Sequence, residues 1–161
     1  MASLTANKLC DIKSICYNAG LRCCCIGCCV GSAGSGIIVG KEGKSLLIVS
    51  PITTHYIGVG WCSRAVGVTC ATNAYNPATY GEPPWFIPRM ADLKFAVQQY
   101  QVLQTLSIYP MYYGVVYWSD ERFACNGPSG FASGVNTQKL TYGGYCHCYS
   151  CYALALRRLY Y

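Results

Sequence analysis

The chain has 161 residues, of which 53% are hydrophobic and 11% are charged, and its formal net charge is +6. This length fits one domain with a packed core, and the apolar fraction excludes an intrinsically disordered chain. The lysines and arginines form no basic run interleaved with aromatic residues, so nucleic-acid binding is not expected. A surface poor in charge and rich in tyrosine favours a protein specialised for contacts, although tyrosine is also a common sheet residue.

Residues 1–33 differ in composition from the rest of the chain and are expected to form an N-terminal arm for attachment. Charged residues interrupt this region before any signal-peptide core, and apolar residues around Leu9 allow a short amphipathic helix. The uncharged run 23–40 is rich in glycine and serine, so membrane insertion is not expected. Seven cysteines lie between Cys10 and Cys29, where packed thiols are favoured over lipid attachment.

The chain contains 13 cysteines, which is an odd and unusually high number. Most are expected to be small buried residues, because free cysteine is among the most buried residue types. Disulfides are an alternative whose pairing the sequence does not give, and a zinc site in residues 146–151 (CHCYSC) is a weaker one. We therefore predict no metal and no cofactor.

A predicted β-hairpin opens the domain, which spans residues 34–161. Residues 37–39 and 45–50 are apolar runs bridged by residues 40–44 (GKEGK), and Pro51 ends the second strand. Residues 52–80 mix threonine, glycine, asparagine and proline, so we expect an irregular stretch with short turns.

The strongest helix signal lies in residues 88–103, after a loop that two prolines stiffen. Asp92 falls early in this helix, where a negative charge suits the helix dipole. Apolar residues recur at steps of three and four, which predicts one buried face made of Met90, Leu93, Val97, Tyr100 and Leu103.

Strands are predicted for most of the remaining chain. Residues 112–120 (YYGVVYWSD) are expected to form a strand that ends in a polar corner, and residues 123–134 a long loop. Residues 131–135 and 139–142 are candidates for a short second hairpin. Residues 152–159 suit a last strand, in which Arg157 and Arg158 face opposite sides.

The candidate contact surface is residues 142–152 (YGGYCHCYSCY), which combine rigid rings with small adaptable residues. A tyrosine-rich sheet or a subunit contact explains this segment equally well. Asp120, Glu121 and Arg122 at the strand corner are polar enough to bind a ligand, but a structural role is favoured, either capping a turn or pairing with Arg157. The predicted ligand- or partner-binding residues are Tyr142, Tyr145, His147, Tyr149, Tyr152, Trp118 and Asp120.

The order of these signals carries a family resemblance. The matching residues are Leu46 to Pro51, then Trp85, Pro88, Asp92 and Leu93, then Tyr117, Trp118, Ser119 and Glu121, and finally Ala155 to Arg158. In this order they resemble the C-type-lectin-like domain of bacteriophage fibre and virion proteins and of bacterial adhesins. The resemblance covers residues 34–159 and leaves the arm outside it.

The resemblance implies an α+β, C-type-lectin-like fold: a small twisted antiparallel sheet in which the chain ends meet, one main helix, and a long irregular loop region that carries function. It does not imply bound calcium, because residues 82–84 (EPP) and 118–120 (WSD) lack the oxygen ligands that calcium-dependent sugar binding needs.

The leading functional interpretation is a non-enzymatic virion protein of a tailed phage. Its loop face is expected to bind a host-surface receptor or glycan, the arm to dock onto other virion proteins, and the chain to form a homo-oligomer. A capsid decoration or head-fibre protein with a purely structural role is the alternative. A copper-dependent thiol-oxidising enzyme of related fold is a further one, with Cys146 or Cys148 paired to Cys151.

Overall fold

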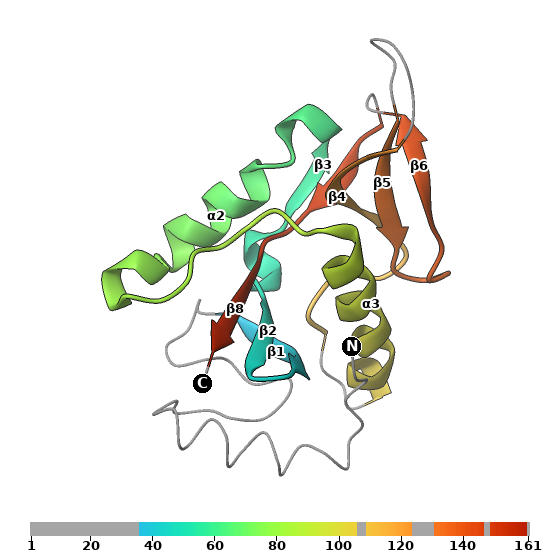
Figure 1. Ribbon diagram of the computed structural model, residues 1–161. Coiled ribbons are helices and arrows are strands. Elements are labelled where there is room, and N and C mark those ends of the chain that lie inside the picture. The colour runs from blue at the N-terminus through green and yellow to red at the C-terminus, as the bar shows by residue number, and fades with distance from the viewer. Residues whose placement is uncertain (1–35, 106–108, 124–130, 147–148, 161) are drawn as a thin grey trace.

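The computed structural model of the chain describes residues 36–105, 109–123, 131–146 and 149–160. Within these ranges the chain forms an α+β fold, with helices α2 (Val66–Ala74) and α3 (Met90–Thr105) and two mostly antiparallel sheets (Figure 1). The predicted α+β class is confirmed, but the predicted single small antiparallel sheet is wrong, because the strands form two sheets and one strand pair is parallel. The predicted arm of residues 1–33 and the contact residue His147 lie outside the described residues.

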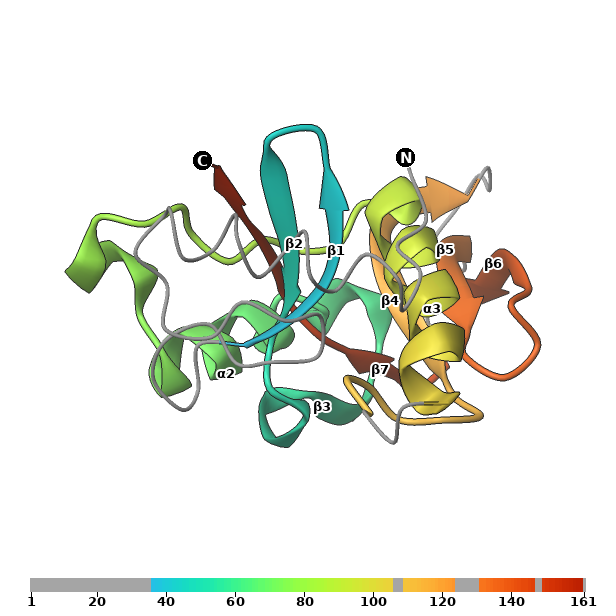
Figure 2. The same ribbon diagram turned by 90° about the horizontal axis from the view of Figure 1, so that it is seen from below.

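The smaller sheet has the strand order β1-β2-β8, formed by Ile37–Glu42, Ser45–Val49 and Leu156–Tyr160. Strands β1 and β2 are the predicted hairpin, but its turn is shorter than expected because residues 40–42 belong to β1. Strand β2 pairs with β8 along its whole length, so the two ends of the domain meet in this sheet, as predicted (Figure 2).

The larger sheet has the strand order β3-β7-β4-β5-β6, formed by Tyr56–Val59, Cys151–Ala153, Val116–Phe123, Phe131–Asn136 and Tyr142–Cys146. Helix α3 packs against β4 and β5 of this sheet and also contacts β1, so it lies between the two sheets (Figures 1 and 2). All five residues of its predicted apolar face are buried in the main core. A second, smaller core cluster lies around Trp118.

Residues 52–80 are more regular than expected. They contain helix α2, strand β3 and three 3-10 turns at Ile52–Thr54, Trp61–Ser63 and Pro77–Tyr80. The sequence does not predict helix α2, because its nine residues include a glycine and several β-branched residues, which have low helix propensity. Gly67 is needed there: a Cβ atom would lie 2.9 Å from the carbonyl oxygen of Leu154. Tertiary contact therefore fixes this helix more than its local sequence does.

Three predicted strands have wrong bounds. Strand β4 spans Val116–Phe123 instead of residues 112–120. Residues 123 and 131–134 of the predicted loop therefore belong to β4 and β5, and residues 124–130 lie outside the described residues. The second short hairpin strand is β6 (Tyr142–Cys146), because residues 137–141 form the turn, where Leu140 has a φ of 53°. The single last strand predicted over residues 152–159 is two strands, β7 and β8, that belong to different sheets.

The break between β7 and β8 has a clear cause. The amide of Ser50 donates to the carbonyl of Ala155 (3.0 Å), and the amide of Ala155 donates to the hydroxyl of Ser50 (3.1 Å). These bonds hold the chain at the point where it leaves one sheet and enters the other. The residues after the break continue as β8 beside β2.

Arg157 and Arg158 face opposite sides of β8, as predicted. Arg157 is fully buried, forms an ion pair with Glu82 (2.5 Å), and lies about equally far from the rings of Tyr75 (5.0 Å) and Trp85 (5.1 Å). Arg158 pairs with Asp92 of α3 (2.6 Å) and Glu42 of β1 (3.0 Å). The last strand is thus tied to the proline-rich loop on one side and to the helix on the other.

We expect Arg157→Ala to lower the free energy of unfolding by about 3 kcal/mol, because it leaves the Glu82 carboxylate without its partner and empties the space between two rings. Urea unfolding followed by tryptophan fluorescence measures the change. Lys44→Ala, at an exposed turn position, is the control and should leave the midpoint unchanged. Equal midpoints for the two variants would contradict this role of Arg157.

Candidate functional site

A groove of about 430 Å³ lies where residues 149–152 pass the start of β4. We call it the tyrosine groove. Three of the predicted contact residues line it, and none of the lining residues carries a charge. The lining residues are Val115, Val116, Tyr145, Tyr149, Ser150, Cys151 and Tyr152. The structure thus brings together part of the segment that the sequence singled out.

The ring of Tyr145 rests on a rigid base. The ring of Trp118 meets it edge-on at 6.4 Å, and the indole N–H of Trp118 donates to the carbonyl of Val59 (2.7 Å). Gly134 lies against the Tyr145 ring: a Cβ there would come within 2.8 Å of a Val116 methyl and 3.2 Å of the Tyr145 ring. Trp118 is fully buried, so it supports the groove from below and does not face a ligand.

Tyr152 is held by an aromatic cluster. Its ring packs edge-on against Tyr112 (5.3 Å) and Tyr117 (5.7 Å). The Tyr117 hydroxyl accepts a hydrogen bond from the amide of Tyr112 (2.9 Å) and contacts Nδ1 of His55 (2.8 Å). Burial raises the pKa of Tyr117, so this hydroxyl keeps its proton at neutral pH.

The tautomer of His55 follows from its partners. Its Nε2 lies 2.8 Å from the carbonyl of Ser50, which only accepts, so Nε2 carries the proton and Nδ1 accepts from the Tyr117 hydroxyl. Burial lowers the pKa of His55 to about 4, and the hydrogen bond to Ser50 opposes this shift only in part. The imidazole beneath the tyrosine groove is therefore neutral at pH 7.

We expect the protein to lose stability as the pH falls from 6.5 through 4. The pKa of His55 is about 4 in the folded chain and 6.5 in the unfolded chain, so between these values the unfolded chain binds the extra proton. The loss reaches about 3 kcal/mol below pH 4. Urea unfolding at pH 7, 5.5 and 4 measures it.

The matched variant is His55→Gln, whose amide can accept from Tyr117 and donate to Ser50 but does not titrate. Its stability should change less with pH over the same range. An equal change in the variant and the parent chain would show that other groups cause the acid sensitivity.

Tyr142 does not join the groove. It lies three residues before Tyr145 on β6, and because side chains alternate along a strand it points to the α3 side of the sheet. There the ammonium group of Lys94 lies over its ring, 3.4 Å from the centroid. Tyr142 is exposed, but one ring face is already covered.

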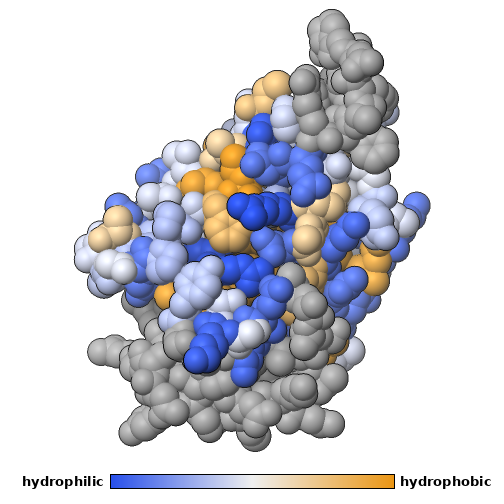
Figure 3. Space-filling view, viewed as in Figure 1, coloured by the Kyte–Doolittle hydropathy of each residue, from blue (hydrophilic) through white to orange (hydrophobic). Residues whose placement is uncertain are grey.

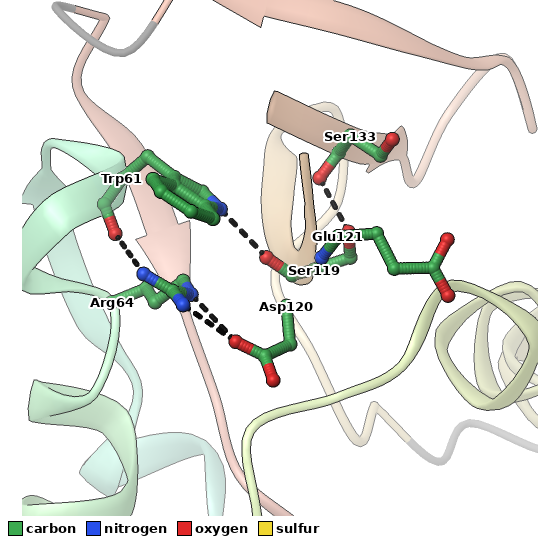
Figure 4. Close-up of polar contacts among 6 residues, drawn as sticks. All are labelled: Trp61, Arg64, Ser119, Asp120, Glu121 and Ser133. Atoms are coloured by element: carbon green, nitrogen blue, oxygen red, sulfur yellow. Dashed lines mark hydrogen bonds and ion pairs between the residues drawn. The ribbon is translucent and has the colours of Figure 1, made fainter. Parts of the chain in front are cut away.

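Asp120 belongs to a separate polar cluster (Figure 4). It lies inside β4, where the pairing register with β5 shifts between Trp118 and Arg122, and we call this irregularity the corner of β4. The Arg64 guanidinium donates to Oδ1 of Asp120 from Nε (3.0 Å) and Nη2 (2.6 Å), and it stacks on the Trp61 ring at 3.7 Å. The Trp61 indole donates to the Ser119 carbonyl (3.0 Å), and the Ser119 hydroxyl donates to the carbonyl of Ser133 (2.7 Å). Asp120 therefore pairs with Arg64, and Arg157 pairs elsewhere.

A second cavity, of about 380 Å³, opens beside this cluster, and we call it the corner pocket. Its lining includes Asp120, and no sequence motif connects that residue with the other members. The other residues that line it are Phe86, Ile87, Arg89, Asp92, Arg158 and Tyr160.

The described cysteines do not form the reactive pair between residues 146 and 151. Cys146 is disulfide-bonded, whereas Cys62, Cys70 and Cys151 are free. Burial raises the pKa of the Cys151 thiol to about 11, which makes it a poor nucleophile at neutral pH. Among the described residues no group of three or more histidine, cysteine or acidic side chains is placed to hold a metal ion. Cys148 lies outside those residues.

No helix in the part of the chain that the structure describes is long and apolar enough to cross a bilayer. No protein-family model matches the sequence, and no curated protein matches it either. The geometry of the groove and the pocket therefore carries the functional argument.

Proposed function

We propose that this chain is a non-enzymatic adhesion protein of a tailed-bacteriophage virion, with a C-type-lectin-like domain at residues 34–161. In this proposal the tyrosine groove binds a host-surface receptor or glycan. Residues 1–33 dock the domain onto other virion proteins, and several copies of the chain assemble into an oligomer.

The fold supports the C-type-lectin-like assignment in three respects. The hairpin that opens the domain pairs with the last strand, because β2 lies between β1 and β8. The segment around Trp85 and Pro88 leads directly into the main helix α3. The Tyr117-Trp118 pair lies in a strand that packs under this helix and next to β7. The meeting of the chain ends and the main helix are features that the family resemblance implies.

The tyrosine groove is the observation that carries the binding role. Its lining offers ring faces and hydroxyl groups without a charged side chain, and the rings of Tyr145 and Tyr152 are held by buried neighbours. Rigid aromatic side chains lose little conformational entropy when a ligand binds. Such a surface suits a neutral partner, such as a sugar face or an apolar protein patch, and the Cys151 thiol in its lining is a poor nucleophile at neutral pH.

A structural role in the particle is the second candidate, and strand β3 favours it. This strand forms one edge of the larger sheet, and the side chains of Tyr56 and Ile57 are 44% and 56% exposed. An edge strand with exposed apolar side chains is a ready place for another chain to pair. In this version the chain is a capsid decoration or head-fibre protein whose copies pack through β3.

Adsorption to host cells separates the two roles. We expect the purified chain to bind host cells and to compete with infection, and Tyr149→Ala to weaken adsorption about tenfold, since truncating an exposed aromatic anchor removes much of the contact energy. Tyr109→Ala is the matched control, because the two rings are similarly exposed (57% and 53%) and Tyr109 lies outside the groove.

Two results would count against the receptor-binding role. One is equal adsorption by Tyr149→Ala and Tyr109→Ala. The other is a chain that does not adsorb to host cells and is found in many copies on the capsid shell, which would support the structural role.

A further inference from the structure

The corner pocket is a separate cavity of about 380 Å³, a volume within the range of small-molecule sites, roughly 300–1,000 Å³. Its walls come from three parts of the chain that are distant in sequence: residues 86–92, which lead into the first turn of α3, then Asp120 in β4, and β8. Figure 3 shows hydrophobic and strongly hydrophilic surface side by side on the face of the molecule where residues 81–88 cross β8. The mixed lining distinguishes this pocket from the uncharged tyrosine groove.

Backbone hydrogen bonds fix the walls of the corner pocket. Phe86 and Leu156 exchange two of them, at 2.7 and 3.1 Å, which joins the loop to β8. The amide of Asp120 donates to the carbonyl of Pro88 at 2.7 Å, which joins the loop to the corner of β4. The pocket is thus preorganised, so a ligand would not have to order it.

Two carboxylates in the pocket are held with one oxygen engaged. Oδ1 of Asp92 accepts from Arg158 (2.6 Å), and Oδ1 of Asp120 accepts from Arg64 (3.0 and 2.6 Å). The second oxygen of each takes no hydrogen bond from the described residues. Each carboxylate therefore offers a fixed acceptor whose charge an arginine already balances.

The remaining polar group is Arg89. Its side chain is exposed, and its guanidinium forms no hydrogen bond or ion pair with the part of the chain that the structure describes. It therefore supplies free donors at the pocket. Phe86 and Tyr160 add aromatic surface, and the Tyr160 side chain is 68% exposed.

The charges of the pocket argue against a strongly charged ligand. Arg89 and Arg158 face Asp92 and Asp120, so a phosphate would meet two carboxylates and an ammonium group would meet two guanidinium groups. A ligand that fits must donate to carboxylate oxygens, accept from a guanidinium and pack against aromatic rings. A neutral pyranose ring has all three properties, with hydroxyl donors, hydroxyl and ring-oxygen acceptors, and an apolar C–H face.

We propose that the corner pocket binds one neutral hexose unit of a glycan. Hydroxyl groups of the sugar donate to Asp92 and Asp120, Arg89 donates to a sugar oxygen, and Phe86 or Tyr160 contacts the C–H face. This site is independent of the tyrosine groove and does not require the groove to have any function.

Binding of sugars to the full chain tests the proposal. Two-dimensional amide NMR spectra are recorded during titration with glucose, galactose, mannose and N-acetylglucosamine, and with glucuronate and glucosamine as charged counterparts. We expect at least one neutral hexose to bind with millimolar Kd and to shift the amides around Phe86, Asp92 and Asp120. An oligosaccharide that ends in the same hexose distinguishes a glycan terminus from the free sugar as the preferred ligand.

Variants place the sugar in one pocket or the other. Arg89→Ala and Tyr160→Ala change exposed side chains, so the fold should persist, and each should raise the Kd about tenfold or more. Tyr109→Ala, an exposed position that lines neither cavity, is the control and should leave the Kd unchanged. If the chain binds the hexose but does not adsorb to host cells, this inference stands and the proposed receptor role is wrong.

Three results would overturn the inference. One is that no neutral hexose shifts any of these amides. Another is that glucuronate or glucosamine binds more tightly than every neutral hexose. The third is that Tyr149→Ala abolishes binding while Arg89→Ala and Tyr160→Ala retain it.

Discussion

The reciprocal hydrogen bonds between Ser50 and Ala155 are the constraint on which the arrangement of the two sheets depends. They join the end of β2 to the point where the last part of the chain changes sheets. Residues before that point form β7 beside β3 and β4, and residues after it form β8 beside β2. The tyrosine groove lies next to β7 and the corner pocket next to β8. One short segment therefore positions both candidate sites, and loss of this junction would displace them together.

Most of the acidic residues of the chain connect elements of the fold. Four of its six acidic residues, Glu42, Glu82, Asp92 and Asp120, form ion pairs with arginines. Because side chains alternate along β8, Arg157 reaches the proline-rich loop while Arg158 reaches helix α3. An arginine that is fully buried needs a partner of opposite charge, and Glu82 supplies it. Several of the few charged residues thus join elements of the fold, so the low charge content of the chain is not explained by a contact surface alone.

The elements that the sequence predicted well are those whose signal is local. The hairpin of β1 and β2 follows from two apolar runs around a glycine-containing turn, and α3 follows from the spacing of its apolar residues. Helix α2 was missed because Gly67 is there to let the helix approach residues 153–154, and that contact is invisible locally. Likewise Trp61 and Arg64 are more than fifty residues away from the Ser119 and Asp120 groups that they hold. Only the fold brings such partners together.

The fold also places the predicted contact residues on different surfaces. Composition alone placed Tyr142, Tyr145, Tyr149 and Tyr152 on one surface, but the two-residue period of β6 sends Tyr142 to the side of α3 and Tyr145 to the other. Trp118 looked like a contact residue because it is aromatic, yet its indole N–H is satisfied inside the core. These residues are still related, since Trp118 and Tyr117 hold the rings that line the groove. An aromatic-rich segment therefore needs buried aromatic residues beneath it, because a ring that is held in place from below binds a ligand without first losing its own freedom.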